Sequence, residues 1–457
     1  MSTSIALFTR NLRVHDNPVL MAAAQSSECV VPLFVHDTAL HATGFATNVR
    51  AGFLTAALAD LDGTLRSTGV CLIVRHGDLV EQVCRLAEEL DVSEVHMAFD
   101  VSDYAQRRQQ RLANALTTGR RVLRLHDDVI TVVAPGRITP TTSGKDHFAV
   151  FTPYLRRWLS TPRRRIAAAP NRLRLPSEVQ DEMPPQVATT RATHGYAGES
   201  EALCAADRWL TGKITSYHEQ HDDLAADSTS HLSPYLHFGC LSPLELVTRA
   251  ADHAGKGAHA FIRQLAWRDF HHQVLAARPK CSHQDYRTRG DRWRDDPDGL
   301  QAWKDGRTGI PIIDAGMRQL GAENWMHNRA RLITASFLTK TLYLDWRVGA
   351  AHFLDLLVDG DIANNNLNWQ WVAGTGTDTR PNRVLNPLRQ ADRYDPTGDY
   401  IRRWVPELAD ITNPKDIHQP WRLGARVLRL LGYPPPIVEL DHARDRFQHA
   451  RQVTRDP

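Results

Sequence analysis

Two different periods of apolar positions divide this chain. In the first 130 residues, short apolar runs alternate with stretches that have helical spacing. The apolar runs predict buried strands at residues 5–8, 29–35, 70–74, 95–99 and 122–125. The stretches between them predict helices at 47–67, 78–90 and 101–116. This alternation predicts an α/β fold with a Rossmann-like, doubly wound parallel sheet.

After residue 200 the period is helical to the end of the chain, which predicts an all-α domain. The stretch 259–278 illustrates it. One face is an apolar stripe of Phe261, Leu265, Phe270 and Val274. A second face carries Gln264, Trp267, Arg268 and His271. An amide, an indole and a guanidinium on one face favour a cavity for a flat ligand with polar edges, with simple solvent exposure as the alternative.

Residues 131–200 are predicted to connect these two parts. Proline interrupts the stretch at Pro135, Pro140, Pro153, Pro162, Pro170, Pro176, Pro184 and Pro185. Proline lacks a backbone donor and blocks long helices. The basic cluster 163–165 is interpreted as solvated surface, with a phosphate contact as the alternative. We expect a domain at 1–130, a linker at 131–200 and a helical domain at 201–457 that closes at 425–457 with one helix and a short basic end.

Composition narrows the class of protein. A chain of 457 residues with 42% hydrophobic and 23% charged residues is typical of an ordinary two-domain globular protein. We find neither an apolar run long enough for a membrane helix nor a signal peptide. The six cysteines form no C-x-x-C pair, so we expect reduced thiols, a cytoplasmic location and no metal site. The sequence gives no sign of an obligate oligomer, so we expect a monomer. Because the net charge is only +3, any nucleic-acid contact must be a local patch.

The dinucleotide-binding fingerprint is missing. The first strand ends in Thr9–Arg13 rather than in G-x-G-x-x-G, and the later pair Gly374 and Gly376 has no third glycine at the right spacing. This pattern disfavours a nicotinamide-dependent oxidoreductase.

Ordered sequence blocks carry a resemblance to one family. The opening stretch LFTRNLRVHDNPVL is followed by blocks at 151–154, 229–234, 267–270, 309–318, 325–329 and 359–371. In order and spacing they resemble the photolyase/cryptochrome family, and most of all its microbial class I photolyases for cyclobutane pyrimidine dimers. The resemblance implies an N-terminal α/β domain for a light-harvesting antenna chromophore. It also implies an all-α C-terminal domain that holds FAD.

The resemblance also implies which residues bind FAD. Matching positions are Tyr217, Thr229, Ser230, His231, Leu232, Ser233, Phe261, Gln264, Arg268, Asn328, Arg331, Asp359, Asp361 and Asn365. The hydroxyls and backbone N–H groups of 229–233 suit phosphates, although Thr229 and Ser230 could simply cap a helix. The family usually has arginine where this chain has His231, so phosphate binding would depend more on backbone donors.

Four FAD positions have more specific implied roles. Arg331 and Asp359 match an ion pair beside the isoalloxazine, where a buried pair tunes electrostatics more than it stabilises the fold. Asp361 matches the residue at the pyrimidine edge of the flavin. Asn365 matches the asparagine that faces flavin N5, where an amide would tune which reduced states persist. The alternative for the run 364–366 is a turn.

Tryptophans are concentrated after residue 200, where ten of eleven lie. A large helical core would explain this distribution, but Trp369, Trp346 and Trp293 also match the electron-transfer chain of the family. With Gln264 and Asn365, they form the predicted catalytic set.

The implied substrate is damaged DNA with the lesion flipped out of the duplex. The matching positions are Gln264, Trp267, Asn328, Arg329, Leu332, Trp371 and Gln390. In the implied reaction, a carbon–carbon lyase reaction driven by blue light, excited reduced FAD gives an electron to the dimer and later regains it.

Two of these positions depart from the class I pattern. Gln264 replaces a glutamate, which points toward six-four photolyases and animal cryptochromes. Leu332 replaces a methionine and is not the histidine that six-four photolyases use, so cyclobutane-dimer repair is favoured. The stretch 99–104 matches the folate-binding pattern poorly. A deazaflavin antenna in contact with Arg10 and Asp100 is therefore favoured over folate.

Two rival functions stay open. A cryptochrome could use the same flavin and tryptophans for signalling without repair, and a photolyase could act on a different lesion. The chain has no long extension after its helical part, which favours repair.

Overall fold

The computed structural model describes residues 2–141, 144–179 and 197–453. They form two compact units. The first contains residues 1–218 and 230–280, and the second contains 219–229 and 281–457. The division into domains at residues 130 and 200 stays a prediction. Its linker lies partly outside the described residues, because 180–196, with Pro184 and Pro185, are among those not described.

The first unit contains a five-stranded parallel sheet. Its strands are β1 (Thr3–Phe8), β2 (Cys29–Asp37), β3 (Ile73–Gly77), β4 (Glu94–Ala98) and β5 (Val122–His126). Their order is β3-β2-β1-β4-β5, so β1 is central and pairs with β2 and β4. Every residue of β1 is buried. Strands covered on both faces become continuous apolar runs, which is why the sequence predicted them. The α/β parallel fold is confirmed.

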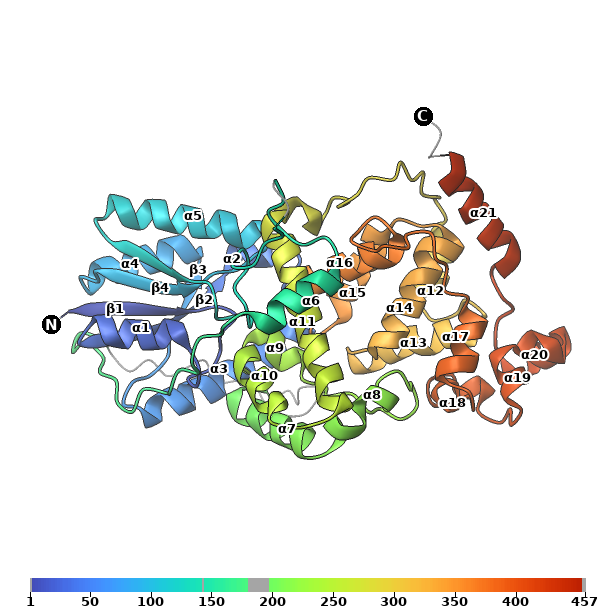
Figure 1. Ribbon diagram of the computed structural model, residues 1–457, viewed down its shortest axis with the longest axis horizontal. Coiled ribbons are helices and arrows are strands. Elements are labelled where there is room, and N and C mark those ends of the chain that lie inside the picture. Colours follow the sequence, from blue (N-terminus) through green and yellow to red (C-terminus); the bar gives the residue numbers. More distant parts are fainter. Residues whose placement is uncertain (1, 142–143, 180–196, 454–457) are drawn as a thin grey trace. The chain divides into compact units, whose positions relative to one another are not determined.

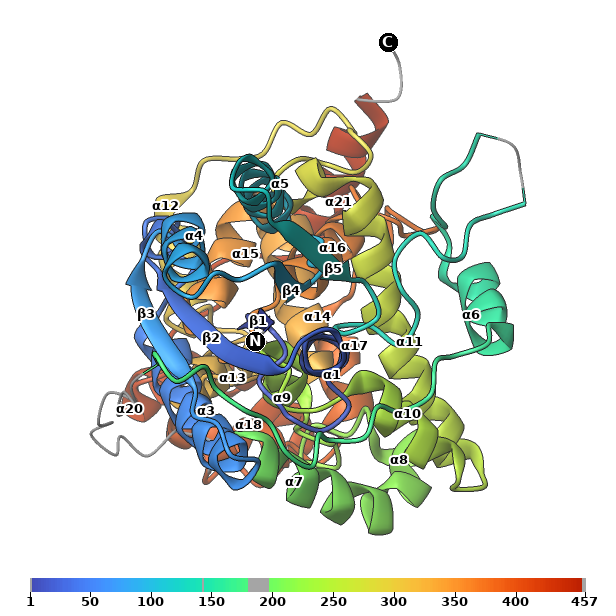
Figure 2. The same ribbon diagram turned by 90° about the vertical axis from the view of Figure 1, so that its left-hand side faces the viewer.

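Helices cover both faces of this sheet. On one face lie α4 (Leu79–Glu89) and α5 (Asp103–Thr118) (Figure 2). Their apolar side chains pack against those of the strands. The other face is covered by α1 (Pro18–Ser26) and α3 (Asn48–Ser67) (Figure 2). The predicted strand at 70–74 begins only at Ile73, because the backbone N–H of Leu72 donates to the Asp62 carboxylate instead of to a strand.

Helical segments complete the first unit (Figure 1). They are α2 (Thr38–His41), α6 (Phe151–Ser160), α7 (Glu199–Thr211), η1 (Lys213–Ser216), α9 (Ser233–Phe238), α10 (Pro243–Ala251) and α11 (Lys256–Ala277). The short α8 (Tyr217–Gln220) continues into the second unit. Helix α6 lies inside the proline-rich stretch that was predicted to be only a connector. Pro153 is tolerated there because it falls in the first turn, where a helix needs no backbone donor.

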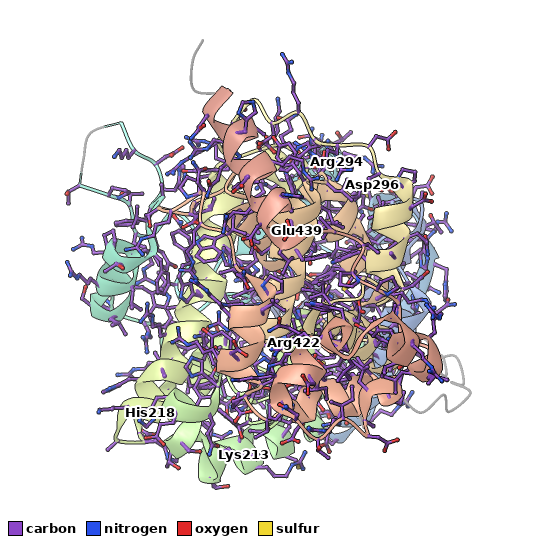
Figure 3. The ribbon with its side chains drawn as sticks, turned by 90° about the vertical axis from the view of Figure 1, so that its right-hand side faces the viewer. Lys213, His218, Arg294, Asp296, Arg422 and Glu439 are labelled. Atoms are coloured by element: carbon purple, nitrogen blue, oxygen red, sulfur yellow. The ribbon has the colours of Figure 1, made fainter. Side chains whose placement is uncertain are left out.

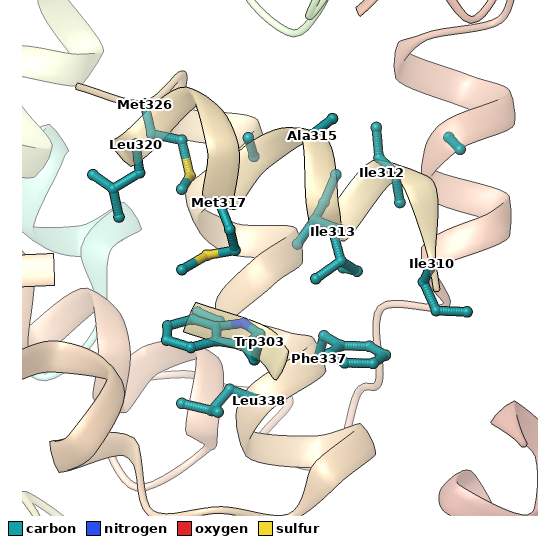
Figure 4. Close-up of a cluster of buried hydrophobic side chains, with 14 of the residues drawn as sticks. Trp303, Ile310, Ile312, Ile313, Ala315, Met317, Leu320, Met326, Phe337 and Leu338 are labelled. Carbon is teal, nitrogen blue, oxygen red and sulfur yellow. The ribbon is translucent and has the colours of Figure 1, made fainter. Parts of the chain in front are cut away.

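The second unit is helical, which confirms the all-α prediction for this part. The short η2 (Pro279–Ser282) begins in the first unit and ends in the second. The second unit also contains α12 (Pro297–Lys304), α13 (Pro311–Glu323), α14 (Asn328–Ser336), η3 (Phe337–Leu342), α15 (Trp346–Leu356), α16 (Ile362–Ala373), α17 (Pro387–Tyr394), α18 (Asp399–Trp404), η4 (Pro406–Leu408), α19 (Pro414–His418), η5 (Pro420–Leu423), α20 (Ala425–Leu431) and α21 (Leu440–Val453). Trp303 is fully buried at its centre, near Met317, Phe337 and Leu338 (Figure 4). Its indole N–H donates to the Thr334 carbonyl at 3.1 Å, so this buried donor has a hydrogen-bond partner.

The single closing helix predicted at 425–457 is wrong. The structure has two helices, α20 and α21, separated by Gly432 and three prolines at 434–436. Gly432 has a φ of 70°, a left-handed conformation that ends a helix at no steric penalty. The prolines then prevent the helix from resuming.

None of the helices described here is long and apolar enough to span a membrane. Within the same residues, no group of three histidine, cysteine or acidic side chains is arranged to hold a metal ion.

Candidate functional site

Helix α11 in the first unit carries the mixed polar and aromatic face predicted from the sequence. Trp267 stacks face to face on Phe151 of α6, with ring centroids 3.7 Å apart and planes 7° from parallel. Phe270 meets Trp267 edge-on at 5.5 Å. Trp267 remains partly exposed and Gln264 is exposed. A rigid indole beside an accessible amide suits contact with a flat, polar-edged ligand.

Arg268 and Asp269 anchor the same helix to other segments of the first unit. The Arg268 guanidinium donates to the carbonyls of Ile130 and Leu236. The Asp269 carboxylate accepts from the Trp158 indole at 2.9 Å and from two backbone N–H groups. Burial raises the pKa of Asp269 to about 6, although these donors oppose that rise. These contacts fix the orientation of the part of α11 just before Arg268, which carries Gln264 and Trp267.

The predicted phosphate-binding residues of the first unit lie in and around one turn. His231 has a φ of 52°, a conformation uncommon for a residue with a side chain. The backbone N–H of Leu232 donates to the Ser230 hydroxyl at 3.4 Å, and α9 begins at Ser233. Elsewhere in this unit, Tyr217 packs edge-on against Phe261 with ring centroids 5.8 Å apart. Thr229, the remaining member of the predicted turn, belongs to the second unit.

The two predicted antenna contacts are brought together. Arg10 lies 3.4 Å from the Asp100 carboxylate, and its Nε donates to the His237 carbonyl. A second ion pair, which the sequence analysis missed, joins Asp37 at the end of β2 to Arg108 at 3.1 Å. In open α/β sheets, ligands bind at the carboxyl ends of the strands, so Asp37 is suitably placed for ligand binding. Its position directly after an apolar strand was the available sequence signal.

The predicted Arg331–Asp359 ion pair is formed in the second unit. The Arg331 guanidinium lies 2.9 Å from the Asp359 carboxylate, and its Nε donates to the Met326 carbonyl at 2.8 Å. Asp359 is buried and Arg331 is partly exposed. The pair therefore maintains a charged group in a largely desolvated position, which is costly unless it serves binding or chemistry.

Asp361 and the asparagines form the first turn of α16. The Asp361 side chain caps the helix by accepting from the backbone N–H of Asn364 at 2.7 Å. The Asn365 amide donates to the Ala350 carbonyl at 3.0 Å and to Asn366. The alternative interpretation of 364–366 as an isolated turn is therefore wrong. Capping explains the location of Asp361, and the Asn365 side-chain amide has a carbonyl acceptor as well as its donors.

The three predicted electron-transfer tryptophans all lie in the second unit. Trp369 and Trp346 are buried, with exposed fractions of 3% and 1%, and Trp293 is partly exposed. Helices α15 and α16 approach so closely that a Cβ at Gly349 would clash with the Trp369 ring. The Trp346 indole donates to Asp285 at 2.9 Å. Two buried rings and one partly exposed ring are compatible with a route from the interior to the surface, and the electron-transfer role stays a prediction.

The predicted DNA contacts of the second unit occupy different environments. Arg329 is bound on both sides: it forms an ion pair with Asp222 at 2.8 Å, and its guanidinium lies over the Tyr394 ring. Leu332 and Trp371 are partly buried against the core of this unit. Asn328 at the start of α14 is exposed, and Gln390 on α17 is partly exposed.

The chemistry of the two residue sets fits FAD. The first unit offers hydroxyls and backbone N–H groups in a turn, which suit a pyrophosphate. The second unit offers a buried carboxylate–guanidinium pair and side-chain amides, which suit the polar edge of a flavin ring. The role of each residue stays a prediction.

Family comparisons agree with this chemistry. The family described as DNA photolyase matches residues 4–173, and the FAD binding domain of DNA photolyase matches residues 261–452. A protein of Streptomyces griseus named deoxyribodipyrimidine photo-lyase is 55% identical over 454 residues, covering 99% of each chain. The Escherichia coli protein of that name is 33% identical and covers 100% of this chain and 99% of its own.

Solved structures extend the similarity to the whole fold. A class III photolyase from Agrobacterium tumefaciens has a TM-score of 0.90 and 31% identity, over 100% of this chain and 98% of its own. A cryptochrome from Synechocystis has a TM-score of 0.88 and 28% identity, over 98% and 99%. A photolyase from Sulfolobus tokodaii, described with two FAD molecules, has a TM-score of 0.84 and 28% identity, over 99% and 100%. This chain belongs to the DNA photolyase family and carries the FAD-binding domain of that family.

Proposed function

We propose that this chain repairs cyclobutane pyrimidine dimers in DNA, using blue light and bound FAD. The observation that carries the proposal is the 55% identity, over 99% of the chain, to a protein named deoxyribodipyrimidine photo-lyase. Fold alone would not suffice, because cryptochromes share it.

DNA contacts follow from the chemistry of a flipped lesion. A dimer stacks and pairs poorly, so its extrusion is less unfavourable than that of normal bases. Trp267, held by its stack on Phe151, supplies a flat apolar wall for the extruded bases. Trp371 and Leu332 supply further apolar surface, and Asn328 and Gln390 supply polar contacts. Exposed basic side chains would hold the phosphates, so affinity should fall with salt.

In this proposal, the residues that match the FAD positions of the family bind the cofactor. The phosphates and one side of the cofactor would be held by Tyr217, the 229–233 turn, Phe261 and Arg268. Arg331, Asp359, Asp361 and Asn365 would surround the isoalloxazine. Bound FAD, when fully reduced and excited, supplies the electron that splits the dimer and accepts it back. The protein positions both partners and stabilises transient charge.

Trp369, Trp346 and Trp293 would carry electrons inward when the cofactor has been oxidised. Oxidised tryptophan is a short-lived cation radical, so a route works only if each indole is close to the next. The support for this role is that one unit contains all three rings, two of them buried and the third, Trp293, partly exposed.

The choice of lesion depends on Gln264 and Leu332. Gln264 can donate to a damaged base through its amide but cannot transfer a proton readily. This chain has Leu332 where six-four photolyases use a histidine, so the acid expected for six-four repair is missing from that position. We therefore assign cyclobutane dimers and expect a modest quantum yield.

The antenna is proposed to be a deazaflavin near Arg10 and Asp100. The Sulfolobus neighbour, described with two FAD molecules, makes a second flavin the competing candidate. Denaturing the purified protein and identifying the released chromophores by mass distinguishes the two. The expected monomeric state and cytoplasmic location stay predictions, and light scattering after size exclusion tests the first.

A repair assay tests the proposed function. Reduced protein is illuminated with blue light in the presence of oligonucleotides containing a single cyclobutane dimer, alongside a dark control and a six-four substrate. Light-dependent recovery of intact thymines in the first substrate alone is expected. Binding and photoreduction of FAD without repair of either lesion would instead support a cryptochrome.

A further inference from the structure

Tyr343 lies beside Trp293, at the outer end of the predicted tryptophan chain. The two rings are 5.1 Å apart between centroids and tilted by 50°. The backbone N–H of Arg294 donates to the Tyr343 carbonyl at 2.9 Å, which holds the segment carrying Trp293 against this tyrosine. Arg294 itself is exposed on the face seen in Figure 3. Tyr343 is thus a buried, oxidisable ring directly behind a partly exposed tryptophan.

The phenol of Tyr343 has a defined hydrogen-bond acceptor. Its O–H donates to the Asp291 carboxylate at 3.0 Å. Asp291 is held in turn by Arg451 of α21, 2.9 Å away, and their side chains are only 1% and 3% exposed. A carboxylate oriented by a guanidinium and aimed at a phenol has the geometry of a proton acceptor.

Protonation at rest agrees with this geometry. Burial raises the pKa of Tyr343 to about 12, so the phenol is neutral at physiological pH. Burial also raises the pKa of Asp291, although Arg451 and Tyr343 oppose the rise, and this makes the carboxylate a better base. Phenol oxidation requires loss of the O–H proton, because a phenol radical cation is strongly acidic.

We propose that Tyr343 is an electron donor to oxidised Trp293, and that Asp291 accepts the phenolic proton in the same step. This inference rests on the proposed role of Trp293. One electron passes from Tyr343 to the Trp293 cation radical, and the Oη proton moves to Asp291. The products are neutral Trp293, a neutral tyrosyl radical and a protonated Asp291, so charge and atoms balance. The positive charge leaves the tryptophan, which slows the return of the electron from the inner end.

A simpler explanation of the same contacts is a buried phenol that merely satisfies its hydrogen bond. Tyr343→Phe separates the two, because it keeps the ring and removes the O–H. Laser-flash absorption and electron paramagnetic resonance follow the radicals in FAD-loaded protein. In the wild type, the tryptophan radical should be replaced by a tyrosyl radical, with a slower conversion in D₂O. In Tyr343→Phe, the tyrosyl signal should vanish and the tryptophan radical should live on the order of tenfold longer or more, given what a positioned base contributes.

Two further variants make the test specific. Asp291→Asn keeps a hydrogen-bond acceptor but cannot take the proton at neutral pH, so it should lower the tyrosyl yield and remove the D₂O effect. Tyr400→Phe is the matched control, because Tyr400 is equally buried and donates to Gln319 instead. It should leave all radical lifetimes unchanged. Equal tryptophan lifetimes in wild type and Tyr343→Phe would overturn the proposal.

An external oxidant separates this proposal from the rest of the chain. A ruthenium photo-oxidant in solution can oxidise the partly exposed Trp293 without exciting any flavin. With this oxidant, a tyrosyl radical that forms in the wild type but not in Tyr343→Phe supports electron transfer from Tyr343. That result holds even if photoreduction survives in Trp369→Phe and the proposed tryptophan chain is wrong. The opposite result is loss of photoreduction in Trp369→Phe, with no tyrosyl radical after either flavin excitation or ruthenium oxidation. It would support the tryptophan chain and show that Tyr343 is not part of it.

Discussion

Phe151 and Trp267 are stacked nearly parallel, with 3.7 Å between their ring centroids. The stack joins α6 of the proline-rich connector to α11. The Arg263 guanidinium lies over the Phe151 ring, 5.6 Å from its centroid. Trp267 is therefore positioned in advance of any substrate. Preorganised aromatic surface binds extruded bases without a further loss of side-chain entropy.

Phe151→Ala should weaken binding of dimer-containing DNA. An aromatic pair contributes about 0.5–1.5 kcal/mol beyond the area it buries, so the Kd should rise several-fold. The quantum yield for bound substrate should change little, and Phe151→Tyr should restore affinity. Phe148→Ala is the control, because Phe148 packs edge-on against Tyr154. Titrations by fluorescence anisotropy provide the Kd, and unchanged affinity in Phe151→Ala would refute a positioning role.

Gln264→Glu should retain repair and raise its quantum yield. A carboxyl group can share a proton with the damaged bases and stabilise their radical anion, which an amide does poorly. The measurement is dimers repaired per absorbed photon at saturating DNA. Gln110→Glu, a change on the exposed surface of α5, should have no effect. Complete loss of repair in Gln264→Glu would contradict this view of the site.

Arg331→Leu should destabilise the second unit and reduce FAD retention. Removing one partner of a buried ion pair costs about 3–5 kcal/mol, because the Asp359 charge then lacks the Arg331 guanidinium. Urea unfolding and flavin absorbance per chain measure the two effects. Arg318→Leu, at the more exposed Arg318–Glu407 pair, should lose less stability and no flavin. Equal flavin content in both variants would rule out a cofactor role for Arg331.

Trp369→Phe should abolish photoreduction of FAD while leaving repair intact in chemically reduced protein. The electron route requires an oxidisable indole, but the splitting reaction itself does not. Trp303→Phe offers a matched control, since Trp303 is also buried and lies 6.0 Å from Trp369 by ring centroids. Photoreduction should survive in that variant. Similar photoreduction rates in both variants would show that Trp369 is only part of the core.

Lys340 should make stability depend on pH between 7 and 10. Its ammonium is buried and donates to the carbonyls of Pro381 and Arg383, and burial lowers its pKa to about 7. Between that value and the ordinary 10.5, the unfolded chain binds a proton that the folded protein does not. The free energy of unfolding should therefore rise with pH, relative to Lys340→Met, by at most about 1.4 kcal/mol per pH unit.

Urea unfolding of wild type and Lys340→Met at a series of pH values measures this difference. Lys415→Met, on the exposed surface of α19, should follow the wild type throughout. A constant difference between wild type and Lys340→Met would mean that Lys340 titrates alike in both states.

Local patterns predicted much of the fold. The strands were visible because a central parallel strand is apolar on both faces, as in β1 and β2. Predictions were wrong where a long-range contact or a cap decided the boundary. The Asp62 carboxylate delays the start of β3, and Gly432 divides the closing helix.

The sequence by itself determined the family and the alternation of strands and helices in the first part of the chain, and its residue positions for FAD and DNA stay predictions. Those features depend on residues that are neighbours along the chain and on short sequence motifs, which can be recognised without knowing the tertiary structure. Only the tertiary structure decided which side chains meet: Phe151 with Trp267, Arg329 with Asp222, and Tyr343 with Asp291 and Arg451. Each of these contacts joins segments far apart in sequence, because packing brings them together and hydrophobic periodicity carries no information about partners.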